Sequence, residues 1–197
     1  MSETIQSGVY MKKEDWLEKA LLALSKSGGQ KPRIGALVAE IGVSRGSFYW
    51  HFKDRAEFIK ELVDYWHAES TLVVASRLDA MDASAEDKLR TLMDMICVQK
   101  LTRHDQAVRN WALGEPSVEA QVKRTDEFRC GYVKKLFKAC GFSDQDARFR
   151  ATIFVSEASR EGLLFNAMNE KARRKRAKMF FDLLMTNSSN GVVSIDV

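Results

Sequence analysis

The stretch that most constrains this chain is residues 37–52, which read LVAEIGVSRGSFYWHF. Leu37 and Ile41 lie one helical turn apart and predict a short amphipathic helix. Gly42 ends that pattern, because glycine adopts a positive φ at little steric cost. Ser44 carries a hydroxyl that can accept a hydrogen bond from a free backbone N–H, so a second helix is expected to begin there. Two short helices joined by a glycine turn predict a helix-turn-helix.

The second helix has an apolar side and a polar side. Phe48 and Phe52 are four residues apart and are predicted to be core. Arg45 is the best candidate for a base contact, since its guanidinium matches the guanine edge, and the other polar groups suit phosphates. Trp50 has two open interpretations, packing on the sugar-phosphate or shielding the core. The DNA-contacting candidates are Arg33, Ser44, Arg45, Gly46, Ser47, Tyr49, Trp50, His51 and Lys53.

The run 41–58, IGVSRGSFYWHFKDRAEF, resembles the DNA-binding signature of TetR-type transcriptional regulators. The turn glycine, cap serine, Phe-Tyr pair, aromatic-His-Phe group and following lysine all occur in register. Val38 departs from the small alanine usual in the family, and Arg33 stands in place of a Ser/Thr helix cap. The resemblance implies a dimer that binds an inverted-repeat operator, and a C-terminal pocket whose small-molecule ligand controls DNA binding.

Composition places the chain among ordinary globular proteins. Its 197 residues are 45% hydrophobic and 29% charged, with a formal charge of +4. Two prolines and the near absence of alternating apolar and polar residues favour an all-α fold. Three cysteines without a C-x-x-C pair indicate reduced thiols, and we expect no metal or other cofactor. The first 15 residues lack an apolar leader and no run reaches bilayer-spanning length, so a cytoplasmic location and no membrane partner are expected.

Apolar periodicity and cap residues predict the order of the helices. The expected ranges are about 13–26, the helix-turn-helix, a long helix from Asp54 to about 78, then 84–97, 104–113, 117–141, 143–163 and 169–185. The long helix is interpreted as the linker between two helical regions. Three domains follow: a helix-turn-helix domain over 1–55, a ligand-binding and dimerisation domain over 56–186, and a flexible tail over 187–197.

The C-terminal region is predicted to hold the ligand and the dimer interface, and core packing is the competing interpretation for each position. The pocket candidates are Met93, Cys97, His104, Arg109, Trp111, Phe128 and Tyr132. The interface candidates, on the last two helices, are Phe154, Ala158, Gly162, Leu163, Phe180 and Leu184. The basic run 171–176 (KARRKR) wraps around a helix and is expected to form a solvated rim.

These patterns favour sequence-specific DNA binding by a dimeric regulator over two alternatives. Catalysis is disfavoured because no G-x-S-x-G, H-E-x-x-H, P-loop or G-x-G-x-x-G occurs and the three histidines are scattered. A helical protein-interaction module without DNA binding is the other alternative. The cluster of Arg45, Lys53 and Arg55 with Tyr49 and His51 argues against it. The resemblance to TetR-type regulators favours a repressor released by a small ligand, while the residues themselves do not distinguish a repressor from an activator.

Overall fold

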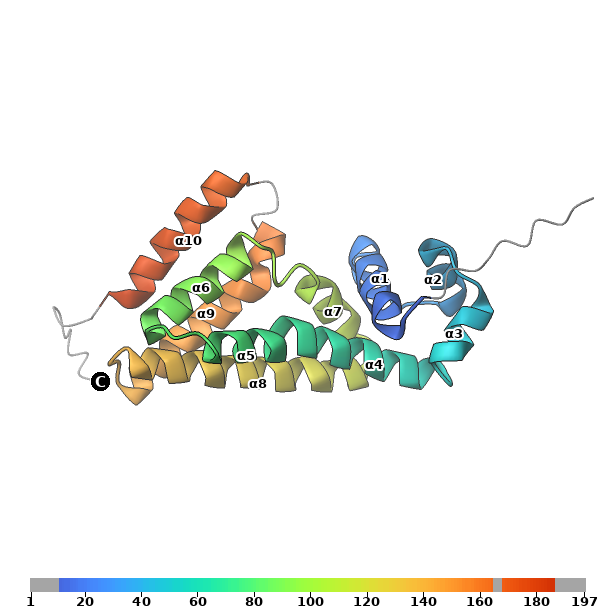
Figure 1. The fold of residues 1–197 in the computed structure, drawn as a ribbon, viewed down its shortest axis with the longest axis horizontal. Helices are drawn as coiled ribbons and strands as arrows, with labels where there is room; N and C mark the ends of the chain where they lie inside the picture. Colours follow the sequence, from blue (N-terminus) through green and yellow to red (C-terminus); the bar gives the residue numbers. More distant parts are fainter. Residues whose placement is uncertain (1–10, 165–167, 187–197) are drawn as a thin grey trace, which may run out of the picture. The chain divides into compact units, whose positions relative to one another are not determined.

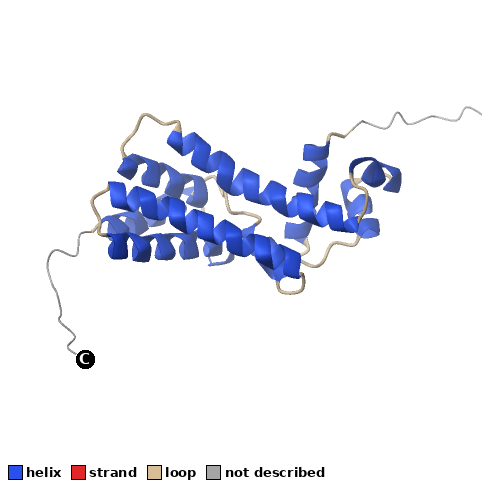
Figure 2. Cartoon of the chain, turned by 90° about the horizontal axis from the view of Figure 1, so that it is seen from below, coloured by secondary structure: helices blue, strands red, loops and turns tan. Residues whose placement is uncertain are grey.

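The computed structural model describes residues 11–164 and 168–186, with the backbone alone for 161–164. All regular structure in these ranges is helical (Figure 2), which confirms the all-α prediction. The α-helices, labelled in Figure 1, are α1 Lys13–Lys26, α2 Ile34–Ile41, α3 Arg45–His51, α4 Arg55–His67, α5 Val73–Asp79, α6 Ala85–Cys97, α7 Asp105–Ala112, α8 Pro116–Ala139, α9 Asp144–Leu164 and α10 Glu170–Met185. A π-helical turn, η1, spans Ala68–Leu72 between α4 and α5. The predicted tail over 187–197 lies outside the described residues.

Most helices begin where the cap residues predicted, with two local differences. Asp54 does not lie in the first turn of α4 but caps it, its Oδ1 accepting the Glu57 N–H at 2.9 Å. Helix α8 begins at Pro116 and not after a Ser117 cap, because proline at the first helical position has no N–H to satisfy.

The long helix expected from Asp54 to about residue 78 is interrupted. Helices α4 and α5 are joined by η1, a five-residue π-helical turn. In a π-helical turn the backbone hydrogen bonds span five residues and not four, so the side chains that follow point in other directions than in a regular α-helix. Ser70 and Thr71 lie on this turn, and Thr71 is buried.

The chain divides into two compact units that do not follow the predicted boundary after residue 55. Unit 1 comprises Met1–Glu69 and His104–Lys123, and unit 2 comprises Ser70–Arg103 and Arg124–Val197. Helix α7, expected in the ligand-binding domain, therefore packs with the helix-turn-helix. Within the described parts of the chain, no helix combines the length and the apolarity needed to cross a bilayer.

An aromatic cluster forms the centre of unit 1. The Trp16 ring lies 5.7 Å from Phe48, 5.6 Å from Phe52 and 5.9 Å from Phe58 between centroids, each pair edge to face. All four side chains are buried. Edge-to-face pairs add to the free energy gained by burying the rings. The predicted core role of Phe48 and Phe52 is confirmed.

Unit 2 is a helical bundle whose last helix, α10, packs on α6 (Figure 1). Leu89, Phe137 and Phe154 are buried in its core. Two cations of the basic run of α10 form ion pairs within the unit: Arg174 contacts Asp94 and Glu170 at 2.9 Å. Arg176 also pairs with Glu157. These pairs agree with a charged rim.

Candidate nucleic-acid interface and ligand cavity

The turn between α2 and α3 is set by backbone and hydroxyl bonds. Gly42 has φ 77° and ψ 34°, a left-handed conformation that favours glycine. The Val43 N–H donates to the Val38 carbonyl at 3.0 Å, which closes the end of α2. Ser44 Oγ then accepts the Ser47 N–H at 3.2 Å and caps α3, as predicted.

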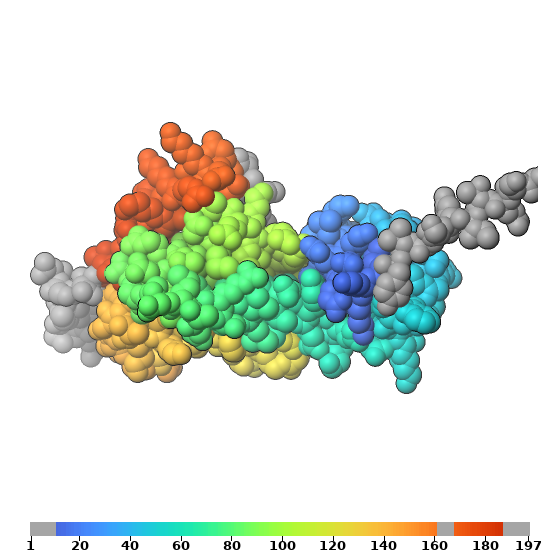
Figure 3. Space-filling view, in the orientation of Figure 1, coloured from blue at the N-terminus to red at the C-terminus, as the bar shows by residue number. Residues whose placement is uncertain are grey.

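Helix α3 is fixed to unit 1 by one face only. Phe48 is fully buried in the aromatic cluster, and Phe52 immediately after the helix is buried as well. Trp16 Nε1 donates to Ser47 Oγ at 3.2 Å, which ties the start of α3 to α1. The helix therefore has a defined orientation, while its other face lies at the surface of the unit (cyan in Figure 3).

The outer face of α3 displays most of the predicted DNA-contacting residues. Arg45, Gly46 and Tyr49 are exposed, as is Lys53 beyond the helix. Trp50 is 75% exposed, so it does not shield the core. A Cβ added to Gly46 would meet only Ser44 Oγ, at an ordinary 3.5 Å. Packing within unit 1 therefore does not require a glycine there.

Three predicted contacts have partners or surroundings that the sequence did not indicate. His51 Nε2 donates to the Met11 carbonyl at 2.8 Å, so this ring holds the segment before α1. The Ser47 hydroxyl, as noted, accepts from Trp16. Arg33 is exposed and caps α2 without a side-chain bond, which leaves its guanidinium at the surface. Val38 is buried and does not prevent the two helices from forming.

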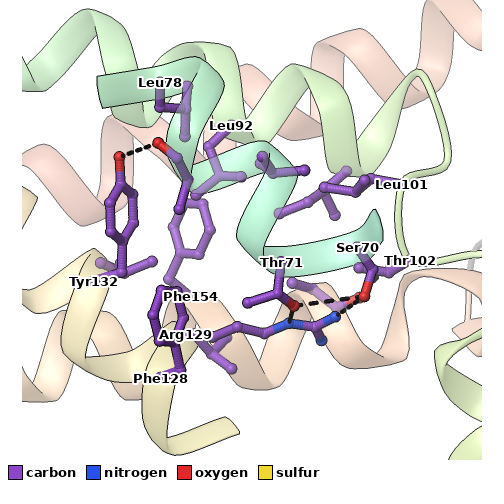
Figure 4. Close-up of a pocket in the computed structure, with 16 residues that line it drawn as sticks. Ser70, Thr71, Leu78, Leu92, Leu101, Thr102, Phe128, Arg129, Tyr132 and Phe154 are labelled. Carbon is purple, nitrogen blue, oxygen red and sulfur yellow. Dashed lines mark hydrogen bonds between the residues drawn. The ribbon is translucent and has the colours of Figure 1, made fainter. Parts of the chain in front are cut away.

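Unit 2 contains a cavity with about 460 Å³ of empty space, part of it continuous with solvent. Of the seven predicted pocket residues, Phe128 and Tyr132 line it. The lining comprises Ser70, Thr71, Val74, Ala75, Leu78, Leu92, Ile96, Leu101, Thr102, Phe128, Arg129, Tyr132, Val133, Phe154, Val155 and Ala158 (Figure 4). Burial, and secondarily a hydrogen bond to Asp79, raise the pKa of the Tyr132 phenol.

The other five predicted pocket residues lie elsewhere. Met93 and Cys97 fill the core of unit 2, where Cys97 Sγ donates to Met93 Sδ at 3.5 Å. His104, Arg109 and Trp111 belong to unit 1. His104 Nδ1 lies 2.6 Å from Ser25 Oγ. Sequence spacing placed Arg109 and Trp111 on a helix correctly, whereas His104 precedes α7 as its N-cap. The spacing could not show with which unit α7 packs.

The predicted interface residues on α9 and α10 are mostly core. Phe154, Ala158 and Leu184 are buried inside their own unit, and Phe180 is half-buried. The side chains of Gly162 and Leu163 lie outside the described residues. The large apolar side chains that α9 and α10 expose are instead Phe149, Ile153, Met179 and Leu183.

A glycine turn, a hydroxyl-capped second helix and an exposed basic and aromatic face define a helix-turn-helix protein of the DNA-binding class. Residues 17–62 match the family model described as bacterial regulatory proteins, tetR family. These residues therefore form a DNA-binding domain of the tetR type.

Two curated relatives are named as HTH-type transcriptional regulators. The chain is 28% identical over 80 residues to the HTH-type transcriptional regulator AcrR of Shigella flexneri, covering 41% of this chain and 36% of AcrR. It is 25% identical over 134 residues to the HTH-type transcriptional regulator TtgR of Pseudomonas putida, covering 68% of this chain and 53% of TtgR. The matches thus span between about a third and a half of these relatives.

The same fold occurs in the fatty acid degradation regulator FadR from Bacillus halodurans, with a TM-score of 0.66. That comparison covers 91% of this chain and 97% of FadR, at 11% identity. At this identity the likeness concerns the fold alone.

Proposed function

We propose that this protein is a dimeric transcriptional repressor that binds an inverted-repeat operator through α3 and is released by a small organic ligand. The observation that carries the proposal is the exposed face of α3, in which Arg45, Tyr49 and Trp50 reach solvent while Phe48 anchors the helix. In this arrangement Arg45 reads a base edge, and Tyr49 and Lys53 contact phosphates.

DNA binding is tested by selection from a random double-stranded library followed by fluorescence anisotropy on the enriched sequence. We expect an inverted repeat with half-sites about 34–36 Å apart, and affinity that falls steeply with salt. Arg45→Ala should lower affinity for the selected site and relax its sequence preference. Lys19→Ala removes an exposed cation of α1 and serves as the matched control. Failure to enrich any sequence would overturn the proposal.

Dimerisation is proposed through the exposed apolar side chains of α9 and α10. Phe149 is 66% exposed and Leu183 69% exposed in the single chain, an arrangement that favours a covering partner. One recognition helix also buries too little surface for tight specific binding, so two copies are needed.

Light scattering after size exclusion tests the interface. Leu183→Arg should convert a dimer to a monomer at micromolar concentration, because it places a charge within the buried patch. Leu113→Arg, at another highly exposed leucine outside these helices, should leave the mass unchanged. If the wild-type protein is a monomer, the proposed operator need not be an inverted repeat.

Ligand release is proposed because unit 2 holds a mostly apolar cavity with a few polar side chains in its wall, the lining typical of small-molecule sites. Two helical runs, α4–η1–α5 and α8, continue from one unit into the other. A ligand that favours one arrangement of unit 2 then changes the affinity of unit 1 for DNA. A reporter gene placed behind the selected operator distinguishes a repressor from an activator, since deletion of the regulator raises expression only in the first case.

A further inference from the structure

We propose that the cavity of unit 2 selects organic anions with an apolar body, and that Arg129 on α8 binds the anionic group with Ser70 and Thr71 beside it. The proposal rests on the proposed ligand-responsive function and names the chemical class of its ligand. It is carried by the placement of one cation and two hydroxyls at one end of a mostly apolar cavity.

The polar end of the cavity is formed by side chains of η1 and α8, two elements far apart in the sequence. Arg129 Nε donates to Thr71 Oγ1 at 2.9 Å, and Arg129 Nη2 donates to Ser70 Oγ at 2.8 Å (Figure 4). Thr71 is buried. The two bonds hold the plane of the guanidinium against η1, so the charged group has a fixed position at the cavity wall.

The π-helical turn η1 carries both hydroxyls of the cluster. Ser70 and Thr71 are consecutive residues, and both contact the same guanidinium. Single π-helical turns occur often at functional sites, and this one lies at the only charged residue among the sixteen that line the cavity.

The other polar side chains of the lining are committed to protein acceptors. The Tyr132 hydroxyl donates to Asp79 Oδ1 at 2.9 Å and lies 3.3 Å from the Ala75 carbonyl. The Thr102 hydroxyl donates to the Ala158 carbonyl at 2.9 Å. Arg129 is the one residue of the lining that carries a charge, and the remaining wall is mostly aliphatic and aromatic.

Charge determines which ligand group suits this site. The lining includes one cation and no carboxylate, so an ammonium group entering the cavity would meet a like charge. An anion loses hydration on entry, and a guanidinium with planar N–H donors replaces that hydration by charge-assisted hydrogen bonds. A neutral ligand gains burial of its apolar part but lacks the charge interaction. The cavity thus favours a carboxylate or similar anion joined to an apolar body.

Isothermal titration of the full-length protein without DNA tests this selectivity. The probes are octanoate and 4-phenylbutyrate, with 1-octanol, 4-phenyl-1-butanol and octylamine as matched neutral and cationic compounds. We expect at least one of the two anions to bind at millimolar concentrations or below, at least about tenfold more tightly than its alcohol and than octylamine.

Substitutions then assign the selectivity to Arg129. Arg129→Gln should weaken binding of the anion by about tenfold or more and leave the alcohol within about twofold. Lys135→Gln removes a charge from an exposed position of the same helix outside the cavity lining, and should change neither. Circular dichroism confirms folding; if Arg129→Gln unfolds, the comparison of anion and alcohol on the wild-type protein still decides.

Three results would overturn the proposal: equal binding of anion and alcohol, tighter binding of octylamine, or no saturable binding of either anion. If the Arg129→Gln variant still binds the anion more tightly than the alcohol, the proposed role of Arg129 is overturned. Since these titrations contain no DNA, their outcome is separate from that of the operator experiment. Anion binding by a protein that recognises no operator would refute the repressor proposal alone.

Discussion

Phe48 and Trp50 stand two residues apart on α3 and have opposite surroundings. The Phe48 ring packs 5.7 Å from Trp16 and 5.4 Å from Phe58, whereas Trp50 is mostly exposed. Phe48→Ala should lower the free energy of unfolding of unit 1 by about 3–5 kcal/mol, because it leaves a cavity. Trp50→Ala should change it by less than about 0.5 kcal/mol. Urea denaturation followed by circular dichroism measures both, and equal losses would contradict the predicted surroundings.

Substitutions of Ser44 distinguish its effect on stability from its effect on DNA binding. Ser44→Ala removes the acceptor of the Ser47 N–H and should cost about 1 kcal/mol of stability. Ser44→Asp keeps an acceptor at the cap and should retain most of that stability, yet its carboxylate repels phosphate and should weaken DNA binding. Thermal denaturation and anisotropy on the selected operator give the two quantities. Unchanged DNA affinity in Ser44→Asp would show that Ser44 lies away from the DNA.

Residue-level prediction succeeded where the causes are local. A capping hydroxyl and an apolar i, i+4 pair act within one helical turn, so Ser44, Phe48 and Phe52 were assigned from sequence alone. The cavity cluster depends on Ser70 and Arg129, which are 59 residues apart. Neither residue type nor spacing indicates that pair, because only the packing of α8 against η1 brings them together.

At the scale of elements, helix ranges followed from periodicity and caps, but helix faces did not. Phe149 and Phe154 lie five residues apart on α9, and the first is exposed while the second is core. Both faces of this helix carry large apolar side chains, so the sequence pattern identifies no single inward face. Most of the residues predicted for the dimer interface on α9 and α10 are core residues of their own unit. The π-helical turn likewise has no signal in the pattern of residues 54–78.

The connection between α8 and α9 predicts a dependence on pH. Lys134 and Lys138, near the end of α8, contact Asp144 at 2.8 and 3.0 Å and lower the pKa of its carboxyl to about 2. Because the folded pKa is below the unfolded one, this stabilisation is present above about pH 4 and is lost as the pH falls towards 2. Asp144→Asn should unfold with a weaker acid dependence over that range.

Carboxyl NMR titration of the wild-type protein gives the Asp144 pKa directly. High salt should move it back towards its ordinary value, because the carboxylate is at the surface and its ion pairs are screened. A pKa near 4 at low salt would show that the two lysines do not hold this carboxylate in solution.

At the scale of the whole molecule, the division of the chain is not sequential. Residues 104–123 belong to unit 1 although unit 2 begins at residue 70. The core of unit 1 therefore includes Val108 and Trp111 from α7. The predicted boundary after residue 55 was placed where the helix-turn-helix motif ends. The extent of a unit depends instead on which apolar helix faces pack together. The buried Asp105 carboxylate strengthens this association, since Trp66 Nε1 donates to its Oδ1 at 2.9 Å.

Hydrogen exchange tests whether α7 is energetically part of unit 1. Val108 is fully buried among residues of unit 1, and Val108→Ala should cost about 1–3 kcal/mol there. Amides of α1 should then exchange about tenfold faster or more, while those of α10 keep their protection. Leu89→Ala, at a fully buried position of unit 2, should produce the reverse pattern. If Val108→Ala accelerates exchange in α10 and spares α1, then α7 stabilises unit 2, and the predicted boundary after residue 55 is the better description of the molecule.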